Sequence, residues 1–150
     1  MRYYSCDELI KDAKMLCQMI DEPFDAILAV ARGGLTLAHL LAECLEIRDV
    51  FTVTSQGYEG YKKLSCIQLG TLPDLGKRKN ILIVDDIIDS GDTIAHLLKT
   101  IKECYPKKNF KVASLFFKKD ASVQPDFSIH EAKEWIDFFW TRDMHDFNDR

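Results

Sequence analysis

The segment that most constrains the fold runs from Ile81 to Thr93 and reads ILIVDDIIDSGDT. Its first four residues are apolar and mostly β-branched, which is typical of a strand buried on both faces of a parallel sheet. Acidic residues follow at positions 85, 86 and 89, and a small turn, Ser90 to Thr93, comes next. A buried strand that ends in acids and leads into a helix places those acids at the carboxyl edge of an α/β sheet. That edge is where such folds bind ligands.

The same segment combines two kinds of ligand-binding group. The turn from Ser90 to Thr93 offers backbone N–H groups, two hydroxyls and the start of a helix, and this combination suits a phosphate. The carboxylates of Asp85 and Asp86 suit sugar hydroxyls or Mg²⁺. The segment therefore predicts that the ligand is a sugar phosphate.

Helix and strand patterns alternate along the rest of the chain. Before the acidic segment we expect a helix over 5–20, which begins with a Ser5–Glu8 capping box, then a strand over 24–30, a helix over 35–46 and a strand over 50–54. After it we expect a helix over 93–104, a strand over 110–117, short apolar pieces and a charged tail over 141–150. The pattern predicts one domain, residues 1–150, with a doubly wound α/β fold whose mainly parallel sheet is flanked by helices.

Residues 55–79 form the longest stretch without a helix or strand pattern. It contains four glycines, one proline and five lysine or arginine residues. A loop of this length inside a compact domain is usually functional or mobile. We expect the loop from Ser55 to about Lys79 to be mobile and to close over the ligand site.

Composition excludes several classes of protein. The net charge of −4 argues against general nucleic-acid binding, which requires a basic face. No apolar run approaches the roughly 18–20 residues of a membrane span, and the first residues lack the apolar core of a signal peptide. The five cysteines form no C-x-x-C pair, so we interpret them as reduced, mostly buried thiols. Together these features predict a cytoplasmic protein with no stable membrane insertion.

Two motifs resemble those of a known family. Residues Val84 to Thr93 resemble the phosphoribosyl-pyrophosphate (PRPP) motif of type I phosphoribosyltransferases, and Ala31 to Gly34 resemble the pyrophosphate loop of the same family. The resemblance implies that PRPP is bound by Asp85, Asp86, Asp89, Ser90, Gly91, Asp92 and Thr93, and its pyrophosphate by Arg32 and Gly33. Because a carboxylate beside a phosphate is unfavourable, we expect Asp92 to point outward and to use only its N–H.

A third element resembles one branch of that family. Leu115 to Lys118 and Glu134 to Asp137 resemble the base pocket of 6-oxopurine phosphoribosyltransferases, particularly the short bacterial xanthine–guanine type. The resemblance covers nearly the whole chain and implies a small base-binding hood. In it Lys118 would donate to the purine O6 and Trp135 would stack on the purine plane. The carbonyls near Trp135 to Asp137, which include that of Ile136, would meet the 2-substituent.

The resemblance also implies an activity: transfer of a 5-phosphoribosyl group from PRPP to N9 of guanine, xanthine or hypoxanthine. Asp89 would be the catalytic residue, Mg²⁺ the cofactor with Asp85 and Asp86 as its ligands, and a homodimer or homotetramer the assembly. Two alternatives stay open. One is a PRPP-binding regulator on the same fold, and the other is a transferase for a different base such as orotate, uracil or adenine.

Overall fold

The computed structural model describes residues 1–59 and 62–148 of the chain. Its centre is a six-stranded sheet with the strand order β4–β3–β2–β5–β6–β7. The strands are β2 (Ala26–Ala31), β3 (Val50–Glu59), β4 (Lys62–Leu69), β5 (Asn80–Ile88), β6 (Asn109–Phe117) and β7 (Phe127–Glu131). Neighbouring strands are parallel except for the antiparallel pair β3–β4. The predicted doubly wound, mainly parallel α/β fold is confirmed.

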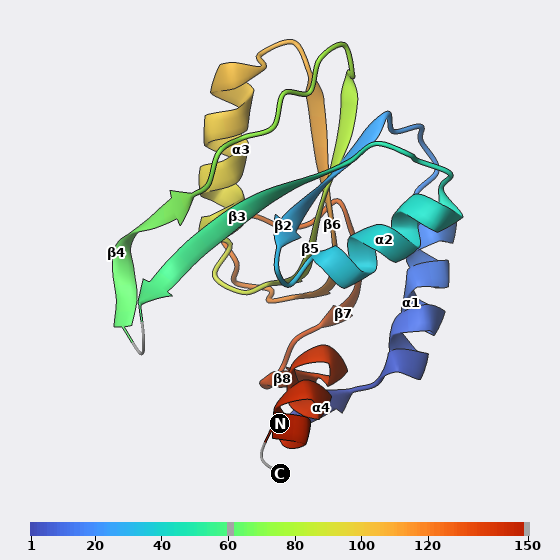
Figure 1. The fold of residues 1–150 in the computed structure, drawn as a ribbon, viewed down its shortest axis with the longest axis vertical. Coiled ribbons are helices and arrows are strands. Elements are labelled where there is room, and N and C mark those ends of the chain that lie inside the picture. The colour runs from blue at the N-terminus through green and yellow to red at the C-terminus, as the bar shows by residue number, and fades with distance from the viewer. Residues whose placement is uncertain (60–61, 149–150) are drawn as a thin grey trace.

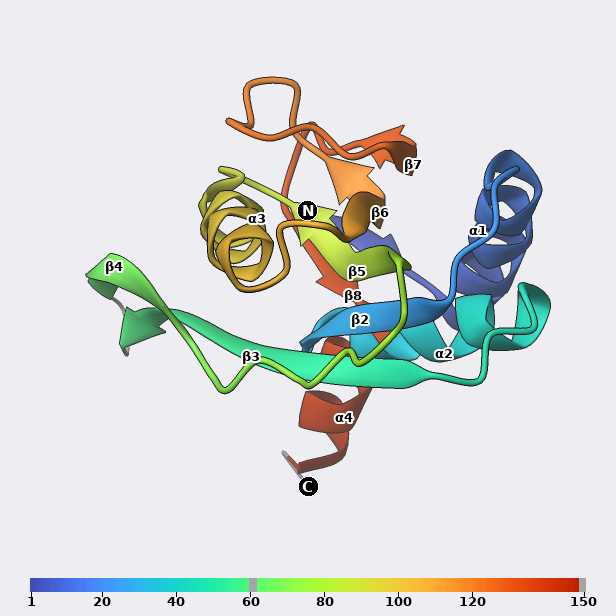
Figure 2. The ribbon, with the colours of Figure 1, turned by 90° about the horizontal axis from the view of Figure 1, so that it is seen from above.

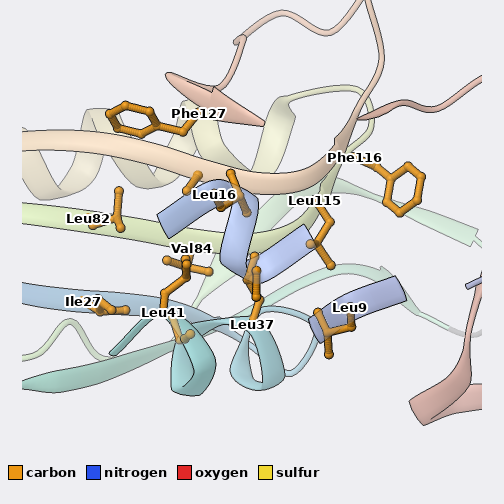
Figure 3. Packing of buried hydrophobic residues seen from close by; sticks show 14 of the residues in the cluster. Leu9, Leu16, Ile27, Leu37, Leu41, Leu82, Val84, Leu115, Phe116 and Phe127 are labelled. Carbon is orange, nitrogen blue, oxygen red and sulfur yellow. The ribbon is translucent and has the colours of Figure 1, made fainter. Parts of the chain in front are cut away.

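Helices cover both faces of the sheet (Figures 1 and 2). Helices α1 (Cys6–Met19) and α2 (Leu35–Cys44) pack on one face, and α3 (Asp92–Cys104) packs on the other. Alternate residues of β5 serve the two faces: Leu82 and Val84 join the α1–α2 core shown in Figure 3, whereas Ile81 and Ile83 join the α3 core. The unbroken apolar run of β5 follows from this burial on both sides.

Helix α1 begins as its sequence predicts. The Ser5 Oγ accepts from the Glu8 N–H at 3.2 Å, and the Glu8 carboxylate accepts from the Ser5 N–H at 2.8 Å. This reciprocal pair satisfies two backbone donors at the start of the helix. No helix in the described ranges combines the length and the apolar character needed to span a membrane.

A second, two-stranded parallel sheet lies at one end of the molecule, next to helix α4 (Figure 1). It pairs β1 (Arg2–Tyr4) with β8 (Ile136–Phe138), and α4 (Phe139–Asn148) follows at once. Neither β1 nor α4 was predicted. A strand of three residues is too short to show a period, and its partner strand lies at the opposite end of the chain.

The prediction of an irregular loop over 55–79 was wrong for most of that stretch. Strand β3 continues to Glu59 and pairs with β4, so that within 55–79 the only described residues without a strand or helix are 70–79. The register shifts between Gln56 and Tyr58, which places Gly57 at a bulge. Glycine and lysine are depleted in strands and concealed the pattern, but an antiparallel pair accommodates glycine at a bulge. Residues 60 and 61 lie outside the described residues.

The interpretation of the cysteines as reduced, mostly buried thiols was also wrong. Cys17 of α1 and Cys44 of α2 form a disulfide, with their Cα atoms 6.3 Å apart. Cys6 and Cys104 are free but exposed, and Cys66 lies outside the described side chains. The disulfide joins residues 27 positions apart, a spacing that matches no motif. It forms because α1 and α2 pack against one face of the sheet.

Candidate active site

The acidic pair belongs to the carboxyl end of β5, because the strand continues to Ile88. The Asp86 N–H donates to Oδ1 of Asp85 at 2.9 Å, and the Ile87 N–H donates to Oδ1 of Asp86 at 2.7 Å. Burial raises the pKa of both carboxyls, and the neighbouring charge of Asp86 raises that of Asp85 further. Two adjacent carboxylates in such surroundings favour a ligand that brings hydroxyl donors or a cation.

The turn after β5 requires a glycine. Gly91 has a φ of +88°, and a Cβ at this position would lie 2.7 Å from the backbone nitrogen of Val123. Helix α3 starts at the next residue, Asp92. The N–H of Asp92, which we expected to hold a phosphate, donates to Oγ of Ser90 at 3.2 Å.

A cleft of about 370 Å³ opens at this end of the sheet. Of the seven residues predicted to bind PRPP, all of them described, Asp92 does not line this cleft. The other six do: Asp85, Asp86, Asp89, Ser90, Gly91 and Thr93. Gly33 lines it from the loop after β2. Ser55 of β3 and Ile67 of β4 line it from the antiparallel β3–β4 pair, which we call the hairpin. The strand ends therefore bring the predicted acids, turn and loop together around one cavity, which we call the first cleft.

The loop after β2 approaches the acidic pair through its glycines. A Cβ on Gly33 would lie 2.6 Å from Oδ2 of Asp86, and one on Gly34 would lie 2.3 Å from the carbonyl oxygen of Val84. Only glycine lets this loop come so close to β5. Arg32 follows a cis peptide bond and is exposed. It lines an adjoining hollow that includes Gly33 and Asp86.

A second cleft, of about 530 Å³, contains all three residues predicted to bind a base: Lys118, Trp135 and Ile136. It shares Asp86, Ile87 and Asp89 with the first cleft, so the two cavities meet at these residues. Nζ of Lys118 lies 2.6 Å from Oδ1 of Asp89. Trp135 is 73% exposed, so most of its ring surface remains available to a flat ligand.

A family comparison agrees with this geometry. The sequence profile of the "Phosphoribosyl transferase domain" matches residues 3–146, which is almost the whole chain. The chain belongs to the phosphoribosyl transferase family.

Individual relatives of this phosphoribosyltransferase are similar over most of their length. A xanthine-guanine phosphoribosyltransferase of Chromohalobacter salexigens is 30% identical over 139 residues, covering 91% of this chain and 81% of the relative. The solved xanthine-guanine-hypoxanthine phosphoribosyltransferase of Helicobacter pylori is 32% identical, covers 99% of both chains and has a TM-score of 0.89. A purine phosphoribosyltransferase of Pyrococcus horikoshii is 29% identical, covers 92% of both chains and has a TM-score of 0.78.

The structure of this phosphoribosyltransferase also gives definite places to residues that were predicted only as parts of a segment. Gly34 shapes the loop, Ser55 lines the first cleft and Asp137 lines the second. Thr141 also lines the second cleft and lies in no segment that we expected at the site. The glycine pair of the loop was a usable signal for Gly34, because close backbone approach needs glycine. Thr141 belongs to the charged tail, which carries no motif, so nothing in the sequence marked it.

Proposed function

We propose that this phosphoribosyltransferase transfers the 5-phosphoribosyl group of PRPP to N9 of a 6-oxopurine: guanine, xanthine or hypoxanthine. The products are the nucleoside 5′-monophosphate and pyrophosphate. The observation that carries the proposal is the junction of the two clefts at Asp86, Ile87 and Asp89. A donor in the first cleft and an acceptor in the second would meet there. The names of the relatives point to the same acceptor class.

In this proposal the donor occupies the first cleft. The 5′-phosphate lies in the turn of Ser90, Gly91 and Thr93, where backbone N–H groups, hydroxyls and the start of α3 favour an anion. Arg32 and Gly33 bind the pyrophosphate, because an exposed guanidinium beside a glycine backbone combines charge with close approach. We do not include the N–H of Asp92 among the phosphate-binding groups, because it already donates to Oγ of Ser90.

The purine occupies the second cleft. Lys118 carries only donors and suits the O6 acceptor of a 6-oxopurine, whereas adenine presents a donor amine at that position. Trp135 stacks on the purine plane, and when the base is guanine, backbone carbonyls near Ile136 accept hydrogen bonds from its 2-amino group. Ile136 is held in place because β8 pairs with β1.

Asp85 and Asp86 fit a Mg²⁺ ion. Mg²⁺ in nucleotide enzymes is usually held by one or two carboxylates together with substrate oxygens and waters, and these two adjacent acids supply such carboxylates. When bound, Mg²⁺ would neutralise charge on the pyrophosphate of PRPP. The raised pKa of both carboxyls, which reflects the cost of burying their charge, agrees with a cation at this position.

The residues of this chain then have separable roles in the transfer. Displacement at an anomeric carbon passes through an oxocarbenium-like state, so charge neutralisation of the leaving group and alignment of the base both lower the barrier. Asp89 lies at the junction and is our candidate for accepting a proton at the purine N7. Ser55 and Ile67 line the first cleft from the hairpin, which supports a role of residues 55–79 in excluding water. A homodimer or homotetramer stays a prediction.

The proposal is tested by identifying the product. Purified protein is incubated with PRPP, guanine and Mg²⁺, and nucleotides are separated by chromatography. We expect guanosine monophosphate from the wild type and at least a hundredfold less from Asp89→Asn. Asp120→Asn is the control, because Asp120 is outside both clefts. Absence of any nucleotide from guanine, xanthine or hypoxanthine, with folded protein that binds PRPP, would contradict the proposal.

A further inference from the structure

A buried carboxylate outside both clefts links three elements of the fold. Asp12 of α1 is 4% exposed, and its Oδ2 lies 2.7 Å from the hydroxyl of Tyr4 and 2.8 Å from Nε2 of His130. Tyr4 belongs to β1 and His130 to β7. A single oxygen thus connects the small sheet, helix α1 and the edge of the large sheet.

The direction of both hydrogen bonds follows from chemistry. An ionised carboxylate only accepts, so the Tyr4 hydroxyl and Nε2 of His130 are donors. Burial, followed by the hydrogen bond to Asp12, raises the pKa of Tyr4, which keeps its hydroxyl protonated. Burying a carboxylate costs folding free energy unless it is well paired. A residue of this kind is therefore better suited to fixing geometry than to adding stability.

Each end of this link adjoins a residue that lines the second cleft, Tyr4 by strand pairing and His130 along the chain. Tyr4 pairs in register with Phe138, which lines the second cleft. His130 precedes Ala132, another lining residue, by two positions. His130 also pairs in register with Phe116 of β6, two positions before Lys118.

Aromatic packing joins the same elements but leaves their orientation less defined. The rings of Tyr4, Phe116 and Phe138 make edge-to-face contacts with centroids 5.1 to 5.9 Å apart. Apolar contacts are non-directional, whereas hydrogen bonds fix distance and angle. The two bonds to Asp12 thus give a directional connection from the small sheet to the large one, beside the Arg2–Glu8 hydrogen bond that joins β1 to α1.

We propose that Asp12, together with Tyr4 and His130, acts as a positioning unit that sets the β8 wall of the second cleft (Ile136–Phe138), through the pairing of β8 with β1, relative to Lys118. Asp12 does not line either cleft, so its effect is exerted through the other two residues and the strands that carry them. The inference rests on the proposed function insofar as the pocket is taken to bind the purine. It predicts that weakening the unit impairs binding of the base and leaves binding of PRPP unchanged.

The test compares two identical substitutions. Tyr4→Phe removes one hydroxyl from the unit and keeps the ring. Tyr105→Phe removes a hydroxyl that bonds to Leu75 and Pro73, away from both clefts. We expect Tyr4→Phe to raise KM for guanine about five- to tenfold, because the competent wall position becomes a smaller fraction of the population. The KM of Tyr4→Phe for PRPP should stay within about twofold of the wild-type value. Tyr105→Phe should keep its KM for guanine and its KM for PRPP within about twofold of wild type.

Substitutions of His130 provide a rescue within the same unit. His130→Leu removes the donor to Asp12 and should raise KM for guanine as Tyr4→Phe does. His130→Gln retains a donor at similar reach and should remain within about twofold of wild type. The proposal would be overturned if His130→Leu and His130→Gln changed the KM for guanine equally. It would also be overturned if Tyr4→Phe and Tyr105→Phe changed that KM equally.

Hydrogen exchange separates this inference from the proposed function. Tyr4→Phe should speed amide exchange in β8 (Ile136–Phe138) at least fivefold while leaving β5 unchanged. If the wild type used no base at all, the proposed function would fail and the exchange result would still decide the positioning role. Unchanged exchange in β8 would refute that role.

Discussion

Replacing Lys118 with alanine separates the contribution of this residue to base binding from its contribution to folding. In the structure Lys118 pairs with Asp89 at 2.6 Å, but the two side chains are 43% and 58% exposed. Exposed ion pairs of this kind contribute about 0–1 kcal/mol. The free energy of unfolding of Lys118→Ala should therefore fall by less than about 1 kcal/mol.

The expected effect on activity is larger. In the complex Lys118 would donate a charge-assisted hydrogen bond to the purine O6. Removing a hydrogen bond that involves a charged group costs about 1.5–3 kcal/mol, which corresponds to a loss of about 10- to 150-fold in kcat/KM. Because Lys118 belongs to the second cleft and not to the first, the KM for PRPP should change little.

The assay is steady-state turnover, with guanine varied at saturating PRPP and then PRPP varied at saturating guanine, together with chemical denaturation of the same samples. Lys119→Ala is the matched control, because the Lys119 side chain is 80% exposed and lines neither cleft. We expect the control to keep its kcat/KM within about twofold. A kcat/KM for Lys118→Ala within threefold of wild type would refute the assignment of Lys118 to the base. A loss confined to the KM for PRPP would refute it as well.

Three further predictions concern the framework of the site. Gly34→Ala should lower the free energy of unfolding by about 1–3 kcal/mol in denaturant titrations, since the added Cβ would lie 2.3 Å from the Val84 carbonyl oxygen; an unchanged midpoint would contradict the close approach. Reducing the Cys17–Cys44 disulfide, which joins residues 27 positions apart, should cost about 3–4 kcal/mol. Thermal unfolding with and without reductant measures this loss of stability, and the unfolding temperature of a Cys17→Ser variant should not change when reductant is added. Ser5→Ala should cost about 1 kcal/mol through loss of the cap of α1, and an equal stability would disprove that contribution.

The sequence was informative where structure is local. The apolar run before Asp85 predicted a strand buried on both faces, and the Ser5–Glu8 pair predicted the start of α1; the structure confirms both. The acids and the glycine turn were expected to share one edge of the sheet, because parallel strands bring their carboxyl ends together. The first cleft contains them for the same reason.

Features that depend on contacts between distant segments escaped prediction. Strand β1 exists because Arg2 to Tyr4 pair with β8, and three residues carry no readable period. The disulfide depends on how α1 and α2 pack, which the spacing of cysteines does not encode. The sequence did not mark Asp12, although it lies between Leu9 and Leu16 on the buried side of α1, because its partners Tyr4 and His130 come from distant strands.

The central claim is that the two clefts form one site for PRPP and a 6-oxopurine. The most direct measurement is pyrophosphate release from PRPP and Mg²⁺, with guanine, xanthine, hypoxanthine, adenine, uracil and orotate offered one at a time. We predict release with one or more of the 6-oxopurines and none above background with the other three bases. Release with adenine, uracil or orotate alone would contradict the pocket assignment, and no release with any base would contradict the enzymatic function.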